Sequence, residues 1–134
     1  MAKIYLLDTC VCISILRNKD GIREKVKSIG LDKCFISEIT IAELCYGASK
    51  SGRKAEKIKD VEQIAKMFTI IPAFNSFQLY GDEKTRLESE GMRIDDFDLL
   101  IGTSAVYNNM VMVTYNTKHF ERIHDIKIEN WIAL

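Results

Sequence analysis

The feature that most constrains the fold of this chain is a series of short, mostly apolar runs separated by stretches with helical periodicity. Such runs occur at residues 4–7, 34–36, 68–71 and 110–113, and a weaker one occurs at residues 126–128. Short apolar runs of this kind are typical of strands buried on both faces of a parallel sheet. Strands that alternate with helices imply right-handed crossovers. We therefore expect a three-layer α/β/α architecture with a central, mainly parallel sheet of four to five strands.

The length and composition favour one globular unit. The chain has 134 residues, which suits one hydrophobic core, and no linker or internal repeat divides it. Hydrophobic residues make up 47% of the sequence, which is too many for a disordered chain. We expect a single domain over residues 1–134.

Charge, hydropathy and cysteine usage exclude several classes of protein. The 19 basic and 19 acidic residues cancel, so there is no overall positive charge of the kind that many nucleic-acid-binding proteins carry. The apolar runs are far shorter than the roughly 20 residues of a membrane span, and no secretory signal is recognisable. The cysteines lack metal-ligand spacing, and we expect them to be reduced residues that fill the core of a cytoplasmic protein. They are Cys10, Cys12, Cys34 and Cys45.

Two acidic residues follow the first two predicted strands. Asp8 ends the first apolar run, where the carboxyl ends of parallel strands bind ligands, although it could equally serve as the N-cap of the next helix. Glu43 lies in the helix after the second strand. If that helix starts at Ser37, Glu43 projects near the same sheet edge as Asp8. If it starts at Thr40, Glu43 is a capping-box residue.

Asp98 is the most informative residue because the helix face that it shares is otherwise apolar. An unpaired ionised carboxylate costs several kcal/mol to bury, and no lysine or arginine occurs between Arg93 and Lys118 to neutralise it locally. A structural ion pair with a distant basic residue is the alternative. The other residues of this face are Ile94, Phe97, Ile101 and Ala105.

Convergence of these three carboxylates would require a cation. At about 5 Å and an effective dielectric constant of ~20, each pair would repel by roughly 3 kcal/mol. A site with oxygen ligands and no converging histidine or cysteine selects Mg²⁺ or Mn²⁺ over Zn²⁺. Such an ion supports phosphodiester hydrolysis.

The same residues carry a family resemblance. It rests on LLDTCVCISIL at 6–16, SEITIAELCYGASKS at 37–51, DDFDLLIGTSAVYNNMVMVTYNTKHFERI at 95–123 and IENW at 128–131. Together these segments resemble the PIN-domain ribonuclease toxins of bacterial type II toxin–antitoxin systems, the VapC family. Each segment is short, but their order and combination are specific.

The resemblance implies a magnesium- or manganese-dependent endoribonuclease that cuts structured RNA, often tRNA, and so inhibits translation. It implies that Asp8, Glu43 and Asp98 are the catalytic metal ligands and that Thr9 is the hydroxyl residue beside the first. It also implies a homodimer and a cognate antitoxin whose C-terminal segment lies across the groove.

The sequence departs from the family pattern at one place. Many PIN domains carry a fourth acid after the last central strand, where this chain has Asn116, and in related toxins an acid aligns with His119. Asp95 and Glu121 are the nearest substitutes. We therefore keep a second hypothesis, in which a PIN-like module with a degenerate acidic site binds RNA or protein without cutting.

Although the overall charge is neutral, the sequence contains a local cluster of basic residues. It is either a surface that attracts RNA or an ordinary solvated helix face. Its members are Lys50, Arg53, Lys54, Lys57 and Lys59.

Overall fold

A computed structural model gives the arrangement of the chain, and it describes residues 2–132. The strands are β1 (Tyr5–Leu7), β2 (Cys34–Ser37), β3 (Thr69–Ile71), β4 (Val111–Val113) and β5 (Ile128–Glu129). The helices are α1 (Thr9–Arg17), α2 (Ile22–Ile29), α3 (Glu38–Lys50), α4 (Lys54–Met67), α5 (Phe77–Ser89), α6 (Asp96–Tyr107) and α7 (Thr117–Phe120). Two 3₁₀ turns, Leu31–Lys33 and Phe74–Ser76, complete the set.

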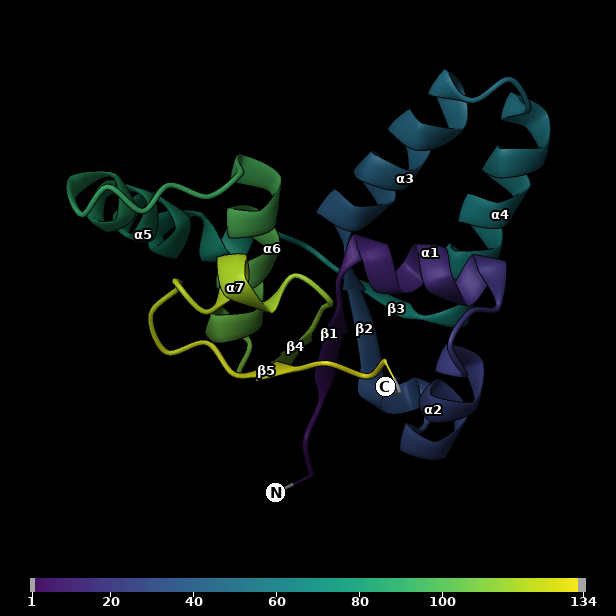
Figure 1. Ribbon diagram of the computed structural model, residues 1–134, viewed down its shortest axis with the longest axis horizontal. Helices are drawn as coiled ribbons and strands as arrows, with labels where there is room; N and C mark the ends of the chain where they lie inside the picture. The colour runs from purple at the N-terminus through teal and green to yellow at the C-terminus, as the bar shows by residue number, and fades with distance from the viewer. Residues whose placement is uncertain (1, 133–134) are drawn as a thin grey trace.

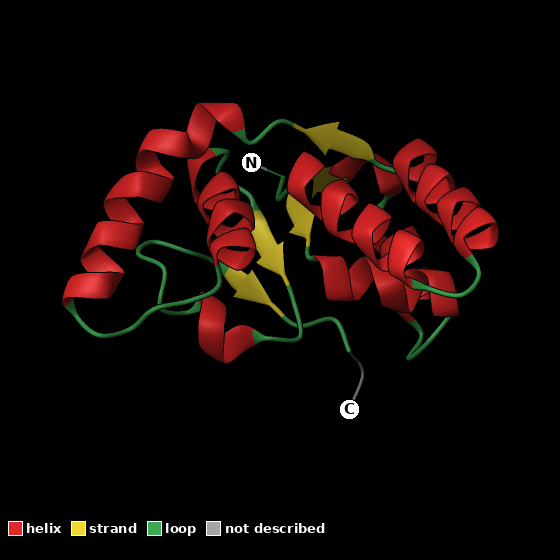
Figure 2. Ribbon diagram, turned by 90° about the horizontal axis from the view of Figure 1, so that it is seen from above, coloured by secondary structure: helices red, strands yellow, loops and turns green. Residues whose placement is uncertain are grey.

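The sheet confirms the predicted architecture. Its order is β3-β2-β1-β4-β5, and every neighbouring pair is parallel. Helices cover both faces (Figure 2). None of the helices within residues 2–132 has the length and apolar character needed to cross a lipid bilayer.

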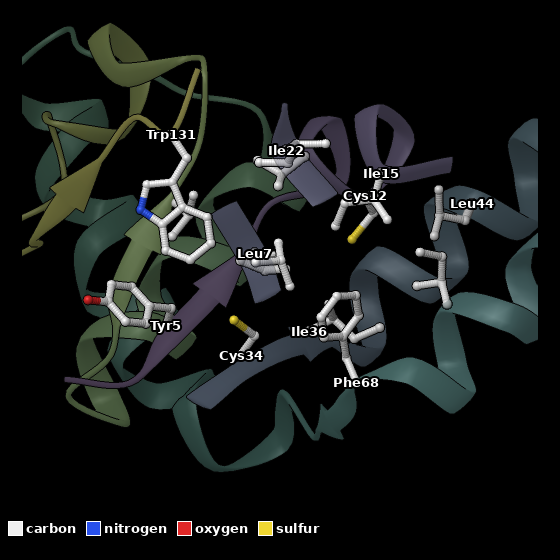
Figure 3. Packing of buried hydrophobic residues seen from close by; sticks show 14 of the residues in the cluster. Tyr5, Leu7, Cys12, Ile15, Ile22, Cys34, Ile36, Leu44, Phe68 and Trp131 are labelled. Carbon is white, nitrogen blue, oxygen red and sulfur yellow. The ribbon is translucent and has the colours of Figure 1, made fainter. Parts of the chain in front are cut away.

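Alternation along β1 divides the core into two clusters, one on each face of the sheet. Tyr5 and Leu7 pack with residues of α1 to α4, and Figure 3 shows this cluster with Trp131 against Tyr5. Leu6 points the other way and packs with Leu99 of α6 and Phe120 of α7. All four cysteines are free thiols, two buried and two partly buried.

One local prediction was wrong. Phe97, which the periodicity predicts to lie on the buried face of α6, is 48% exposed in the first turn of that helix. Elsewhere, α3 continues to Lys50, where the hydroxyl of Ser51 donates to Ala48 O at 2.8 Å, and a 3₁₀ turn precedes α5.

Candidate active site

The predicted acidic residues lie at the carboxyl edge of the sheet. Asp8 follows β1 directly, and α1 and α3 begin side by side where β1 and β2 end (Figure 1). The first turns of α6 lie across from the start of α3. Three helix N-termini therefore surround one point at this edge.

Asp8 is both a helix cap and a buried carboxylate. Its Oδ1 accepts a hydrogen bond from the Thr9 backbone N–H at 2.8 Å, so the N-cap interpretation is correct as far as it goes. Its Oδ2 accepts from Thr114 Oγ1 at 2.8 Å and from Cys10 Sγ at 3.4 Å, and the residue is only 5% exposed. Burial raises the pKa of Asp8, while the hydrogen bonds from Thr114, Thr9 and Cys10 oppose that rise.

Glu43 is not a capping residue. The Oγ atom of Ser37 accepts from Ile39 N at 3.0 Å, so α3 starts at Ser37 and the capping-box interpretation with Thr40 is wrong. Glu43 Oε1 instead accepts a 2.6 Å hydrogen bond from Thr9 Oγ1, which belongs to a different helix. Partial burial raises the pKa of Glu43, and the nearby charges of Asp8 and Asp95 raise it further.

Asp98 is the third predicted acid, and its pKa is strongly raised. Burial raises its pKa to about 7, with further contributions from the charges of Asp8, Asp95 and Glu43. None of the ion pairs formed within the described residues involves Asp98, which removes the distant-basic-residue explanation. The three predicted carboxyl groups are thus electrostatically coupled and lack a basic partner.

The two substitute acids differ in position. Asp95 is the N-cap of α6, accepts from Phe97 N at 3.1 Å, and contributes to the raised pKa values of Asp98 and Glu43. Glu121, at the end of α7, lines a separate surface hollow of about 490 Å³ with Arg86, and it is not among the charges that act on Asp98. Asp95 joins the acidic cluster, whereas Glu121 lies outside it.

Asn116 connects to the cluster indirectly. Its backbone N–H donates to Thr114 Oγ1 at 3.0 Å, and Thr114 in turn donates to Asp8. Its side-chain amide lies 2.8 Å from His119 Nδ1. Thr114 and Asn116, which follow β4, therefore contribute a hydroxyl contact to Asp8 and no negative charge.

Sequence reasoning missed the role of Thr40. Its side chain is fully buried, and its Oγ1 lies 3.1 Å from Thr9 Oγ1. The hydroxyl of Thr9 donates to Glu43 Oε1 at 2.6 Å and also to Thr40 Oγ1, which accepts, so Thr40 helps to position the hydroxyl that contacts Glu43. The spacing of Thr40 one turn before Glu43 was the available signal, but a capping box has the same spacing.

The donor set fits a hard divalent cation. Carboxylate oxygens are the ligands that Mg²⁺ and Mn²⁺ prefer, and the coupled acids have no cationic neighbour to balance them. Among residues 2–132, however, no three histidine, cysteine or acidic side chains are packed closely enough to form a finished metal cage. The structure shows an acidic cluster with hard-cation chemistry and not a preformed cage.

A hollow of about 310 Å³ adjoins this cluster between α1, α3 and α4. Its lining includes Thr9 and Glu43 of the cluster, the acid Asp60 and several apolar side chains. Basic residues from α1 and α4 also line it. The lining residues include Ile13, Leu16, Arg17, Leu44, Gly47, Lys57 and Val61.

Comparison with known proteins identifies the family. The sequence matches the PIN domain family over residues 5–126. It is 34% identical over 131 residues to Ribonuclease VapC2 of Rickettsia felis, covering 96% of this chain and 98% of that protein. This chain belongs to the VapC family of PIN-domain proteins. Another VapC relative, the tRNA(fMet)-specific endonuclease VapC of Salmonella typhimurium, is 32% identical, covering 95% of this chain and 97% of that protein.

Solved VapC structures have the same fold. VapBC2 from Rickettsia felis, crystallised with a DNA fragment from its promoter, aligns with a TM-score of 0.88 and 33% identity over 96% of this chain and 98% of that one. VapBC-1 from nontypeable Haemophilus influenzae aligns with a TM-score of 0.86 and 31% identity over 97% of this chain and 99% of that one. The predicted PIN-like fold and the VapC resemblance are confirmed.

Proposed function

We propose that this VapC-family protein is a Mg²⁺- or Mn²⁺-dependent endoribonuclease and the toxin of a toxin–antitoxin pair. In this proposal it hydrolyses phosphodiester bonds in structured RNA, with tRNA as the expected class, and so inhibits translation. The observation that carries the proposal is the position of Asp98, whose carboxyl group lies among Asp8, Glu43 and Asp95 without a basic partner. The ribonuclease names of the VapC relatives support it.

The chain's own residues have distinct roles in this scheme. Asp8, Glu43 and Asp98 would hold the ion, which when bound supplies positive charge to the phosphodiester and acidifies water. Thr9 fixes the orientation of the Glu43 carboxylate through its 2.6 Å hydrogen bond. Thr114 fixes that of Asp8 through its 2.8 Å hydrogen bond. Both hydroxyls keep the carboxylates oriented before substrate arrives, which is the preorganisation that catalysis needs.

Cleavage of RNA in the presence and absence of divalent ions tests the proposal. Purified protein should cut an RNA pool with Mg²⁺ or Mn²⁺ and not with EDTA, and sequencing should find 5′-phosphate and 3′-hydroxyl ends. Asp8→Asn and Asp98→Asn should abolish cutting. Asp96→Asn is the matched control, because Asp96 lies on the same helix but pairs with Lys84 at 2.9 Å on the surface. Equal loss in all three variants would contradict the proposal.

The same experiment separates the alternative function. Asn116 and His119 stand where relatives often carry an acid, and the cluster is not a finished cage. A module that binds RNA or protein without cutting would retain its binding in the Asp98→Asn variant and show no metal-dependent cleavage in the wild-type protein.

We also propose a cognate antitoxin as a partner, since solved relatives are VapBC complexes. The hollow beside Glu43 suits a segment with apolar residues and a basic side chain, because apolar side chains line it together with the acids Glu43 and Asp60. Gly47 lines this hollow, and a Cβ atom there would meet no atom within 4 Å. Gly47→Leu should therefore weaken co-purification of the antitoxin about 10-fold. Gly81→Leu on α5, which is equally unobstructed, is the control.

We further propose that the protein is a homodimer. An exposed apolar surface adjoins the edge strand β3, where Ile70 is 40% exposed, Phe74 is 73% exposed, and Phe77 is 45% exposed. The rings of Phe74 and Phe77 pack edge to face with 5.7 Å between centroids. Sedimentation of the protein at micromolar concentration should give twice the monomer mass, and a monomer would refute the dimer.

A further inference from the structure

Two exposed aromatic side chains lie beside the acidic cluster. Tyr46 is 67% exposed and lies one turn beyond Glu43 on α3. Phe97 is 48% exposed and directly precedes Asp98 on α6. Each of the two helices that face each other across the site therefore carries an exposed ring within one turn of a predicted metal ligand. Neither ring belongs to either core cluster, so folding does not account for them.

The charge around Tyr46 suits a nucleotide. Lys50, one turn further along α3, places its Nζ 5.7 Å from the centre of the Tyr46 ring. This leaves the opposite face of the ring available to a flat apolar group, while the ammonium can also approach a phosphate. A stacking surface beside a cation is the combination with which proteins bind single-stranded nucleic acids.

Binding of RNA at the acidic cluster requires a source of affinity beyond the bound ion. Four carboxyl groups repel a phosphodiester even when one divalent ion is bound, and the chain as a whole has no net positive charge. Stacking of bases on aromatic rings adds affinity that does not depend on charge. A base in a duplex has both faces covered by its neighbours, so only an unpaired base can use such a ring.

We propose that Tyr46 and Phe97 are stacking surfaces for unpaired bases next to the phosphodiester at the acidic cluster. This proposal rests on the proposed function of the site and narrows its substrate to RNA that is single-stranded at the point of cleavage. Lys50 contacts a phosphate beside the base that stacks on Tyr46.

Binding to RNA with and without bases tests the proposal. The measurement uses the Asp98→Asn protein with Mn²⁺, which removes cleavage, and fluorescence anisotropy of a labelled 12-nucleotide single-stranded RNA of random sequence. The comparison ligand is an abasic ribose-phosphate strand of the same length. We expect the RNA to bind about 10-fold more tightly than the abasic strand. Tyr46→Ala and Phe97→Ala should each lower that ratio several-fold, whereas Tyr46→Phe and Phe97→Tyr should keep it.

The control is a matched aromatic residue away from the site. Tyr107 is 54% exposed and ends α6 at the opposite end from Asp98, so Tyr107→Ala should leave the ratio unchanged. The proposal is overturned if Tyr46→Ala and Phe97→Ala keep the full ratio, or if they change the oligomeric mass, which would make the rings a protein interface. Because the readout is binding, a wild-type protein that cuts no RNA would refute the nuclease and leave this test interpretable.

Discussion

Threonine hydroxyls determine how two of the three carboxylates are oriented. Thr114 donates to Asp8 while it accepts from the backbone of Asn116, so its hydrogen has one direction. Thr9 donates to Glu43 and also to Thr40, whose hydroxyl oxygen accepts. Each of these two carboxylates is therefore contacted by a hydroxyl that has a second polar contact of its own. Within residues 2–132 no hydroxyl contacts Asp98 in this way, and burial together with the neighbouring charges raises its pKa.

We predict that Thr40→Val slows RNA cleavage about 5-fold with little loss of thermal stability. The change removes one hydrogen bond, worth about 1 kcal/mol, from the group that orients Glu43, and keeps the side-chain shape. Cleavage rates at saturating RNA and melting curves measure the two effects. Thr40→Ser should restore the rate because it restores the hydroxyl. Equal rates for the valine and serine variants would show that Thr40 only fills space.

We predict that Asn116→Asp raises cleavage at low Mn²⁺ concentration several-fold. The backbone N–H of residue 116 donates to Thr114, which donates to Asp8, so the substitution puts a carboxylate on a residue whose backbone is tied to the cluster. A further negative oxygen ligand increases affinity for a hard cation. The rate measured against Mn²⁺ concentration should reach half its maximum earlier than in the wild-type protein. Asn116→Ala, which adds no charge, should not show this shift. Slower cleavage at every Mn²⁺ concentration would argue that the amide itself serves the substrate.

At the scale of elements, α4 brings basic residues toward the acidic cluster. Lys57 lines the same hollow as Glu43, whereas Arg53 is paired with Glu56 at 2.7 Å and contributes less free charge. Lys54 and Lys57 lie one turn apart near the start of α4, and both are exposed. Of the five basic residues in the predicted cluster, Arg53 is therefore the one whose charge is neutralised by an ion pair among the described residues.

We predict that the double variant Lys54→Glu/Lys57→Glu weakens RNA binding about 10-fold in low salt and loses less in high salt. Phosphate contacts give affinity that falls as salt rises, so removing them matters most where screening is weakest. Anisotropy titrations at two salt concentrations provide the measurement. Lys27→Glu on α2, which lies on the far side of α1 from the start of α4 in Figure 1, is the control. Unchanged binding would identify this part of α4 as an ordinary solvated face.

The close approach of α6 to α7 depends on one glycine. A Cβ atom at Gly102 would collide with Ile123 Cδ1 and come within 3.2 Å of the Phe120 ring. Gly102→Ala should therefore lower the free energy of unfolding by about 1–3 kcal/mol, despite the better helix propensity of alanine. Chemical denaturation measures this loss. Gly81→Ala on α5, where a Cβ meets nothing within 4 Å, should be neutral or slightly stabilising, and equal effects at both positions would refute the explanation.

Elements with one dominant signal could be predicted from the sequence, and elements decided by tertiary contacts could not. The apolar run at residues 4–7 and the acid after it correctly predicted β1 and the start of α1. Thr40 and Glu43 show the limit, since the same three-residue spacing fits a capping box and a buried contact. Only the position of Thr9, on another helix 31 residues before Thr40, distinguishes them.

At the scale of the whole molecule, the acidic cluster lowers the stability of the folded protein and provides the proposed metal site. Burial raises the pKa values of Asp8, Glu43 and Asp98, and neighbouring carboxylates raise those of Glu43 and Asp98 further. Glu83, outside the acidic cluster, is a stabilising carboxylate. It pairs with Arg86 at 2.8 Å and accepts a hydrogen bond from the His124 backbone N–H at 2.9 Å. Its pKa is lowered, so its contribution is lost only in acid, whereas the acidic cluster acts at neutral pH.

We predict that the metal-free protein becomes less stable as pH rises from about 4 to about 7. The pKa of Asp98 rises from 3.8 to about 7 on folding, so between these values the folded protein binds more protons than the unfolded chain, and stability must fall with pH. Because Asp98 is only half buried, we expect an effect of about 1 kcal/mol after solvent screening. Asp98→Asn should reduce this decline, leaving the smaller contributions of Asp8 and Glu43, and make the metal-free protein more stable than wild type at pH 8. Mn²⁺ should raise the melting temperature of the wild-type protein at pH 8 and affect the variant less, because the ion supplies the charge that the cluster lacks. Melting curves at several pH values measure both effects, with Asp96→Asn as the control. A wild-type protein that gains stability between pH 5 and 7 relative to Asp98→Asn would rule out mutual repulsion within the acidic cluster.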